Sequence, residues 1–166
     1  MVGVEVRRNL GCPASESAKR VRSGHGGGMA MIPNEITGRK ILVVEDDPTC
    51  ADSLARVLAS AGYEIELAGD LAEARAALSR GTPDLITLDL ELGKDSGANL
   101  LVDLRSSPQH RAVPVLLISG VPFDHEEVKK LVRAFGVEES LLLPEAGLQK
   151  PVRPDRLLAE VAAALR

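Results

Sequence analysis

Carboxylates, a hydroxyl and an ammonium group occur at four points along the chain where short apolar segments end or begin. Glu45 and Asp46 follow one such segment, Asp89 and Ser119 follow two later ones, and Lys150 precedes the last helical pattern. Carboxylates that converge repel one another unless a cation lies among them, and a few hard oxygen ligands favour Mg²⁺. A lysine and a hydroxyl suit the oxygens of a phosphoryl group, which a carboxylate can accept as an acyl phosphate. These residue types indicate Mg²⁺-dependent phosphoryl transfer.

Alternating strands and helices are predicted to bring these groups together. Aliphatic segments predict strands over residues 40–44, 63–68, 85–88 and 115–118. Helical spacing predicts helices that begin at Pro48, after Asp70, at Gly97, at Asp124 and near Pro154. Strands that are apolar on both faces belong to a parallel sheet covered by helices on both sides, and function gathers at the carboxyl ends of such strands. We therefore expect one α/β domain with five strands and five helices.

The composition excludes several classes of protein. The chain has 166 residues, of which 45% are hydrophobic but only three are aromatic, and its net charge is −4. Few aromatic rings disfavour base stacking and sugar binding, and an acidic chain does not attract nucleic acid. Two cysteines indicate a reducing compartment, and no segment is apolar enough to span a membrane or to act as a signal peptide. We expect a cytoplasmic protein with no nucleic-acid or membrane partner.

Residues 1–37 differ from the rest of the chain. They contain the glycine run 26–28, carry an excess of basic residues and lack an apolar period, so we expect a flexible leader. Met29 and Met31 lie just before the regular pattern begins. The leader is therefore either a functional tail or the result of a start codon assigned too far upstream, and the domain is expected over residues 38–166.

Four motifs carry a resemblance to a known family. They are ILVVEDDP (41–48), LITLDLELGKDSG (85–97), PVLLISG (114–120) and LQKP (148–151). Because these motifs occur in this order and at the ends of the predicted strands, residues 38–166 resemble the receiver domains of two-component response regulators. The resemblance implies a flavodoxin-like, doubly wound, five-stranded parallel sheet of order 2-1-3-4-5 with helices on both faces.

The resemblance also implies a phosphorylation site and a metal site. Asp89 would be the phosphoacceptor. Asp46 would bind Mg²⁺ directly and Glu45 through water. The full set of implied Mg²⁺ ligands is Glu45, Asp46, Asp89 and the backbone carbonyl of Glu91.

The resemblance assigns roles to residues near the carboxyl ends of the last two strands. Ser119 would be the switch hydroxyl, Lys150 would contact the phosphoryl group, and the Lys150–Pro151 peptide bond would be cis. The spacing of 31 residues between Ser119 and Lys150 is longer than in compact receivers. We therefore expect an inserted loop over residues 138–147.

The chain departs from the family pattern at two glycines. Gly93 replaces a proline, which predicts a looser loop after the acceptor. Gly147 replaces the aromatic residue that reports phosphorylation in the family, so the usual switch is degenerate here. Glu91 and Val121 occupy positions that tune dephosphorylation in the family.

The expected function is a stand-alone receiver. A sensor histidine kinase or histidine phosphotransfer protein would phosphorylate Asp89, and no turnover enzyme activity is expected. Because nothing follows the last helix in the sequence, the output would be contact with another protein, of unknown identity, that depends on phosphorylation.

Other interpretations are open from the sequence. Asp46 or Asp47 before Pro48 also fits a helix N-cap. A receiver that has lost phosphorylation would act as a docking module, which the glycine at position 147 favours. Asp89-Leu90-Glu91 also resembles the metal site of topoisomerase-primase nuclease domains. An aspartyl-phosphate phosphatase would use a strand-end aspartate as well, but would need a second aspartate where Glu91 stands.

Overall fold

The computed structural model describes residues 38–120 and 146–166. The leader expected over residues 1–37 and the helix expected from Asp124 lie outside this part of the chain, as does Val121. The boundary between leader and domain stays a prediction.

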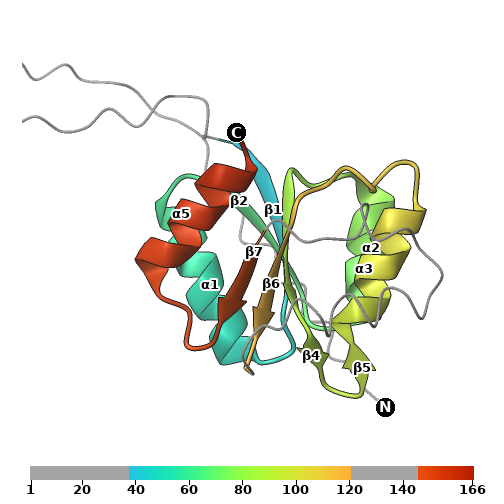
Figure 1. Ribbon diagram of the computed structural model, residues 1–166, viewed down its shortest axis with the longest axis horizontal. Coiled ribbons are helices and arrows are strands. Elements are labelled where there is room, and N and C mark those ends of the chain that lie inside the picture. The colour runs from blue at the N-terminus through green and yellow to red at the C-terminus, as the bar shows by residue number, and fades with distance from the viewer. Residues whose placement is uncertain (1–37, 121–145) are drawn as a thin grey trace, which may run out of the picture. The chain divides into compact units, whose positions relative to one another are not determined.

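A five-stranded parallel sheet forms the centre of the domain (Figure 1), as predicted. Its order is β2-β1-β3-β6-β7, which is the expected 2-1-3-4-5 order of the five sheet strands. The strands are β1 (Lys40–Val44), β2 (Glu64–Ala68), β3 (Leu85–Asp89), β6 (Val115–Ser119) and β7 (Ala146–Gln149). The three central strands are almost fully buried, which explains their aliphatic sequences.

Helices cover both faces of this sheet, as predicted for a doubly wound fold (Figure 1). The described helices are α1 (Pro48–Ser60), α2 (Leu71–Arg80), α3 (Gly97–Ser106) and α5 (Pro154–Ala164). The core on one face contains Leu42, Ile86 and Leu117 together with α2 and α3. The core on the other face contains Ile41, Leu85 and Leu116 together with α1 and α5. Alternate residues of each strand therefore supply the two cores.

Side-chain caps fix where three of the helices begin. Asp47 is the N-cap of α1 and accepts a hydrogen bond of 2.7 Å from the backbone N–H of Cys50. Asp70 caps α2 in the same way, and Ser96 caps α3. The capping interpretation is therefore correct for Asp47, whereas Asp46 is not the capping residue.

The loop after β3 is more regular than expected. Strands β4 (Glu91–Leu92) and β5 (Asp95–Ser96) pair as a short antiparallel hairpin. Gly93 takes a φ of +56° in its turn, a conformation that glycine adopts without steric cost. Gly93 thus forms the tight turn of this hairpin, and the looser loop expected from the loss of the proline stays a prediction.

The inserted loop predicted over residues 138–147 does not include its last two residues. Ala146 and Gly147 belong to β7, where they pair with Leu116 and Leu117 of β6. Backbone pairing to a buried strand decides their conformation, although the sequence Ala-Gly has weak strand propensity. Residues 138–145 lie outside the described part of the chain.

Candidate functional site

The carboxyl ends of β1, β3, β6 and β7 meet at one edge of the sheet. This edge brings together Glu45, Asp89, Ser119 and Lys150, which lie far apart in the sequence. Glu45, Asp89 and Ser119 are 3%, 1% and 1% exposed. Groups of this polarity are almost never buried without partners, so their joint burial marks a site rather than ordinary surface.

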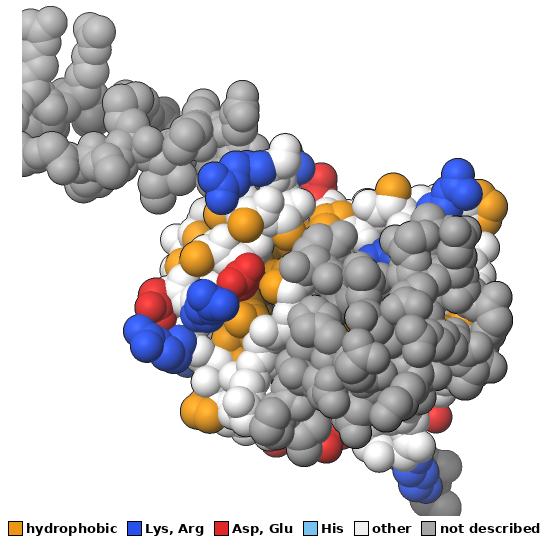
Figure 2. Space-filling view, viewed as in Figure 1, with side chains coloured by type: hydrophobic (Ala, Val, Ile, Leu, Met, Phe, Trp, Pro, Cys, Tyr) orange, Lys and Arg blue, Asp and Glu red, His pale blue; other side chains and the backbone are white. Residues whose placement is uncertain are grey.

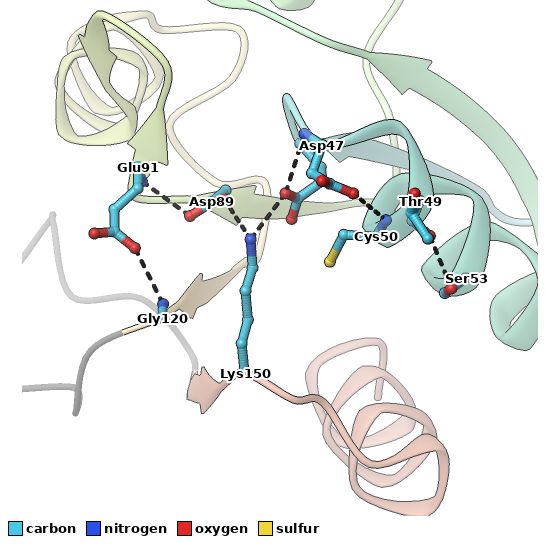
Figure 3. A network of polar contacts seen from close by, with 9 residues as sticks. Asp47, Thr49, Cys50, Ser53, Asp89, Glu91, Gly120 and Lys150 are labelled. Atoms are coloured by element: carbon cyan, nitrogen blue, oxygen red, sulfur yellow. Dashed lines mark hydrogen bonds and ion pairs between the residues drawn. The ribbon is translucent and has the colours of Figure 1, made fainter.

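The ammonium group of Lys150 holds two of the buried carboxylates. Its Nζ atom lies 2.6 Å from Oδ2 of Asp89 and 2.8 Å from Oε1 of Glu45 (Figure 3). Burial alone would lower the pKa of Lys150, but the hydrogen bonds to the two carboxylates outweigh it and raise that pKa above its usual range. The lysine is therefore charged at neutral pH.

The backbone around Lys150 fixes its position beside Ser119. The N–H of Lys150 donates a hydrogen bond of 2.8 Å to the carbonyl of Ser119. The peptide bond between Lys150 and Pro151 is cis. The pairing of β6 with β7 and this hydrogen bond place Ser119 and Lys150 at neighbouring strand ends.

One carboxylate oxygen of Glu45 has no hydrogen-bond partner among the residues that the structure describes. Its Oε2 atom is buried and makes no hydrogen bond within the described part of the chain. Burial raises the pKa of Glu45, the hydrogen bond to Lys150 opposes this, and the charge of Asp89 adds to it. An orphaned carboxylate oxygen in this setting fits the need for a further cation.

Glu45 belongs to an acidic cluster of the right chemistry for Mg²⁺. Glu45, Asp46 and Asp89 can each offer a carboxylate oxygen, and these oxygens lie within 4.8 Å of one another. Hard oxygen donors in small number are what Mg²⁺ takes from proteins while it keeps several waters. The residues present therefore fit the metal that the sequence indicates.

Glu91 contacts the site with its backbone and its side chain. Its N–H donates a hydrogen bond of 2.9 Å to Oδ1 of Asp89. Its Oε2 atom accepts a hydrogen bond of 3.3 Å from the N–H of Gly120 (Figure 3). Both oxygens of Asp89 thus have partners, whereas the Glu91 carboxylate points away from the acidic cluster.

Gly97 supports the backbone of Asp89. Its N–H donates a hydrogen bond of 3.0 Å to the carbonyl of Leu90. A Cβ atom at position 97 would lie 2.0 Å from the carbonyl oxygen of Asp89, so only glycine fits. The sequence shows Gly97 only as the first residue of a helix, and nothing in it indicates this contact.

The comparison with known families decides the identity of this arrangement. A family model described as the response regulator receiver domain matches residues 41–162. The chain belongs to that family.

Relatives and solved structures agree with a receiver fold. The chain is 32% identical over 122 residues to the DNA-binding dual master transcriptional regulator RpaA of Synechocystis, an alignment that covers 69% of the chain and 51% of RpaA. It is 31% identical over 128 residues to the DNA-binding response regulator MtrA of Mycolicibacterium smegmatis, covering 77% and 51%. The chemotaxis response regulator CheY4 of Vibrio cholerae is similar in structure, with a TM-score of 0.65, 27% identity, and coverage of 78% of the chain and 100% of CheY4.

The chain spans about half the length of these two regulators. Because both are named as DNA-binding proteins, the predicted absence of a nucleic-acid partner is not supported. None of the helices in residues 38–120 and 146–166 is both long and apolar enough to cross a membrane.

Position 147 of β7 faces the side of the sheet opposite to α1 and α5. Its neighbours Ala146 and Leu148 pack into the core beneath those helices, so position 147 faces the other way. Gly147 has no side chain there, and no ring extends from β7 at this position.

A groove of about 830 Å³ opens beside Lys150, between α1 and the start of α5. Apolar side chains from α1, from α5 and from the segment just before α5 line most of it: Leu54, Val57, Val152, Pro154 and Leu157. Cys50 lies at the end of the groove nearest the acidic cluster, where burial and the carboxylate of Glu45 raise its pKa to about 11. Its thiol is therefore protonated at neutral pH.

Charges on the outer side of α5 occur in pairs of opposite sign. Arg153 pairs with Asp155 at 2.8 Å, and Arg156 pairs with Glu160 at 3.1 Å. Figure 2 shows blue and red side chains together over this helix, with hydrophobic side chains between them. This helix therefore presents no patch of a single charge.

Proposed function

We propose that this receiver domain accepts a phosphoryl group on Asp89, in the cytoplasm, from the phosphohistidine of a sensor histidine kinase or a histidine phosphotransfer protein. The observation that supports this most is the position of Asp89, buried at the sheet edge between the Lys150 ammonium and the other acidic residues. A nucleophilic carboxylate beside a fixed positive charge is what acyl-phosphate formation needs.

The proposed transfer is a single displacement at phosphorus. An oxygen of Asp89 forms the new bond to phosphorus while the bond from phosphorus to the histidine nitrogen breaks. The imidazole keeps that electron pair and takes a proton from water. Lys150 and Ser119 hold the oxygens of the transferred group. When bound to Glu45, Asp46, Asp89 and the backbone carbonyl of Glu91, Mg²⁺ supplies neutralising charge for the incoming group.

The groove beside Lys150 supports a protein as the donor. Its apolar walls lead from the surface of α1 to the acidic cluster. A helix that carries the phosphohistidine can bury apolar side chains there while its imidazole reaches Asp89. The proposed output is contact with another protein, and the names of the DNA-binding relatives extend this to control of a DNA-binding segment or partner.

The test is chemical labelling of the full chain. Incubation with acetyl phosphate and Mg²⁺ should add one phosphate by intact mass, stable in acid and labile in base. Asp89→Asn and chelation of the metal should each abolish the label. Asp103→Asn, which removes a surface charge on α3, is the matched control and should label normally. A label that persists in Asp89→Asn contradicts the proposal.

A docking module that does not respond to phosphorylation is the second candidate. Gly147 favours it, because the residue that reports phosphorylation in the family is a ring. If the labelled and unlabelled chains bind a co-purified partner with the same affinity, this second function is supported. A nuclease-type site is less well supported, because the Glu91 carboxylate contacts Gly120 and is not part of the acidic cluster.

A further inference from the structure

We infer that the groove beside Lys150 binds the acyl chain of small acyl phosphates, so that this receiver is phosphorylated faster by donors with longer apolar chains than by acetyl phosphate. The groove of about 830 Å³ meets the proposed acceptor site at Lys150. This inference rests on the proposed phosphoryl acceptance at Asp89. It adds a class of small substrate to the protein donors proposed above.

A stripe of residues along α1 forms one wall of the groove. Cys50, Leu54 and Val57 follow one another at intervals of four and three residues, which places them on one face of the helix. The stripe is about 10 Å long, because an α-helix rises about 1.5 Å per residue. A short acyl chain can therefore lie along this wall at full length.

The opposite wall comes from α5 and the segment just before it. Val152 precedes the helix, Pro154 begins it, and Leu157 follows one turn later. Leu54 and Leu157 are 4% and 1% exposed and form the floor, whereas Val57 and Val152 are half-buried and border the open space. Pockets with walls of this kind bind small molecules and have volumes of roughly 300–1,000 Å³. The groove is therefore of a size and composition that suit a small apolar group.

The groove changes from apolar to polar at the end nearest the acceptor. Lys150 belongs both to the groove lining and to the acceptor site, where its Nζ atom lies 2.6 Å from Oδ2 of Asp89. Figure 3 shows the side chain of Lys150 extending from the end of β7 toward Asp89. An acyl phosphate has the same order of parts, a charged phosphoryl head followed by an apolar chain. When its head lies at Asp89, its chain has an apolar surface beside it.

The transfer from an acyl phosphate is a displacement at phosphorus, as with a protein donor. An oxygen of Asp89 forms the new bond to phosphorus, and the bond from phosphorus to the acyl oxygen breaks. The leaving carboxylate keeps that electron pair, so no proton has to be supplied. Straight-chain acids from acetic acid upward differ little in acidity. Chain length therefore acts through binding in the groove rather than through the leaving group.

Burial of each added methylene sets the expected size of the effect. A methylene that becomes half to fully buried strengthens binding by a factor of roughly two to four. Butyryl phosphate has two methylenes more than acetyl phosphate, so it should label Asp89 roughly fourfold to fifteenfold faster at equal, low concentration with Mg²⁺. Hexanoyl phosphate should be faster again, and chains longer than the groove should bring no further gain.

The first measurement is the ratio of the labelling rates with butyryl and acetyl phosphate, followed by intact mass. Val57→Thr and Val152→Thr keep the shape of the walls but add a hydroxyl to each, so the ratio should fall severalfold in the double variant. Val102→Thr on α3 is the matched control, because it makes the same change at a half-buried residue outside the groove lining. A ratio of one in the wild type, an unchanged ratio in the double variant, or an equal fall in Val102→Thr would overturn the inference.

The second measurement does not require labelling. Alkylphosphonates carry a similar charged head on a bond from phosphorus to carbon that Asp89 cannot break. With Mg²⁺, propylphosphonate should bind roughly fourfold to fifteenfold more tightly than methylphosphonate and should shift the methyl NMR signals of Val57 and Leu157. Equal affinities, or methyl signals that stay in place, would overturn the inference. If the wild type takes no label from any donor, the proposed function fails, whereas this titration still decides whether the groove binds the chain.

Discussion

The ammonium of Lys150 lies 2.6 Å from Oδ2 of Asp89 and 2.8 Å from Oε1 of Glu45, so one positive charge is shared by two buried carboxylates. The side chains of both acids are 1% exposed, whereas that of Lys150 is 25% exposed. Two acids and one base leave an excess of negative charge, to which Asp46 adds. Lys150 alone does not neutralise this cluster, which leaves the negative charge that a Mg²⁺ ion would compensate.

Replacement of Lys150 by methionine should strengthen the binding of Mg²⁺. The cluster then keeps its carboxylates without the ammonium, and the cation meets more uncompensated negative charge. We expect a severalfold lower Kd for Mg²⁺ by calorimetry. Without metal, the variant should lose about 1–2 kcal/mol of unfolding free energy, less than the ~3–5 kcal/mol of a fully buried pair, because Lys150 is partly exposed. Lys94→Met in the hairpin turn is the control, and an unchanged Mg²⁺ affinity in Lys150→Met contradicts the prediction.

The pH dependence of Mg²⁺ binding should reflect the raised pKa of Glu45. Burial raises this pKa above 4.5, so Glu45 takes up a proton before an ordinary glutamate does as the pH falls. A proton there competes with the metal, and the apparent affinity for Mg²⁺ should decline while the pH is still above 4.5. Glu45→Gln should bind Mg²⁺ more weakly and lack this part of the decline.

Protonation of Glu45 should raise the unfolding free energy of the metal-free protein, although it weakens the binding of Mg²⁺. Because the folded protein binds this proton at higher pH than the unfolded chain, Glu45 contributes a rise in unfolding free energy as the pH falls toward 4.5 without metal. Urea unfolding of the wild type and Glu45→Gln at a series of pH values measures this difference. Parallel curves for the two proteins would show that Glu45 titrates normally.

Substitution of Gly97 by alanine should damage the acceptor position. The new Cβ would lie 2.0 Å from the carbonyl oxygen of Asp89 and 3.2 Å from Cδ1 of Leu88, so the backbone of the acceptor must move. We expect a loss of about 1–3 kcal/mol in unfolding free energy and slower labelling of Asp89. Gly81→Ala is the matched control, because a Cβ at position 81 meets nothing within 4 Å. Labelling of Gly97→Ala at the wild-type rate would contradict this role.

Sequence patterns predicted the elements whose signals are local. Asp47 and Asp70 cap α1 and α2, and aliphatic segments form the buried strands of the sheet. The parallel arrangement then brings the strand-end groups to one edge, so the candidate site followed from the order of motifs. Its geometry agrees with these expectations, while the roles of the individual residues await the experiments above.

Contacts made by short or distant segments could not be predicted in the same way. Strands β4 and β5 have two residues each, too few for a periodicity to be detected. The start of β7 depends on backbone pairing with β6 rather than on its own side chains. The contact between Gly97 and Asp89 and that between Glu91 and Gly120 depend on the packing of the whole domain.

Thr87 offers a test of the core beneath the site. It is fully buried on β3, opposite Val43 and Leu116, and its hydroxyl has no hydrogen-bond partner within the described part of the chain. Since a buried hydroxyl without a partner is unfavourable, Thr87→Val should raise the unfolding free energy by about 1 kcal/mol. Thr87→Ser keeps the hydroxyl and loses a methyl group, so it should lower that free energy by about 1 kcal/mol.

Urea unfolding measures both changes, and the labelling of Asp89 should stay at the wild-type level in Thr87→Val. A valine variant less stable than the wild type would show that the hydroxyl has a favourable partner in solution.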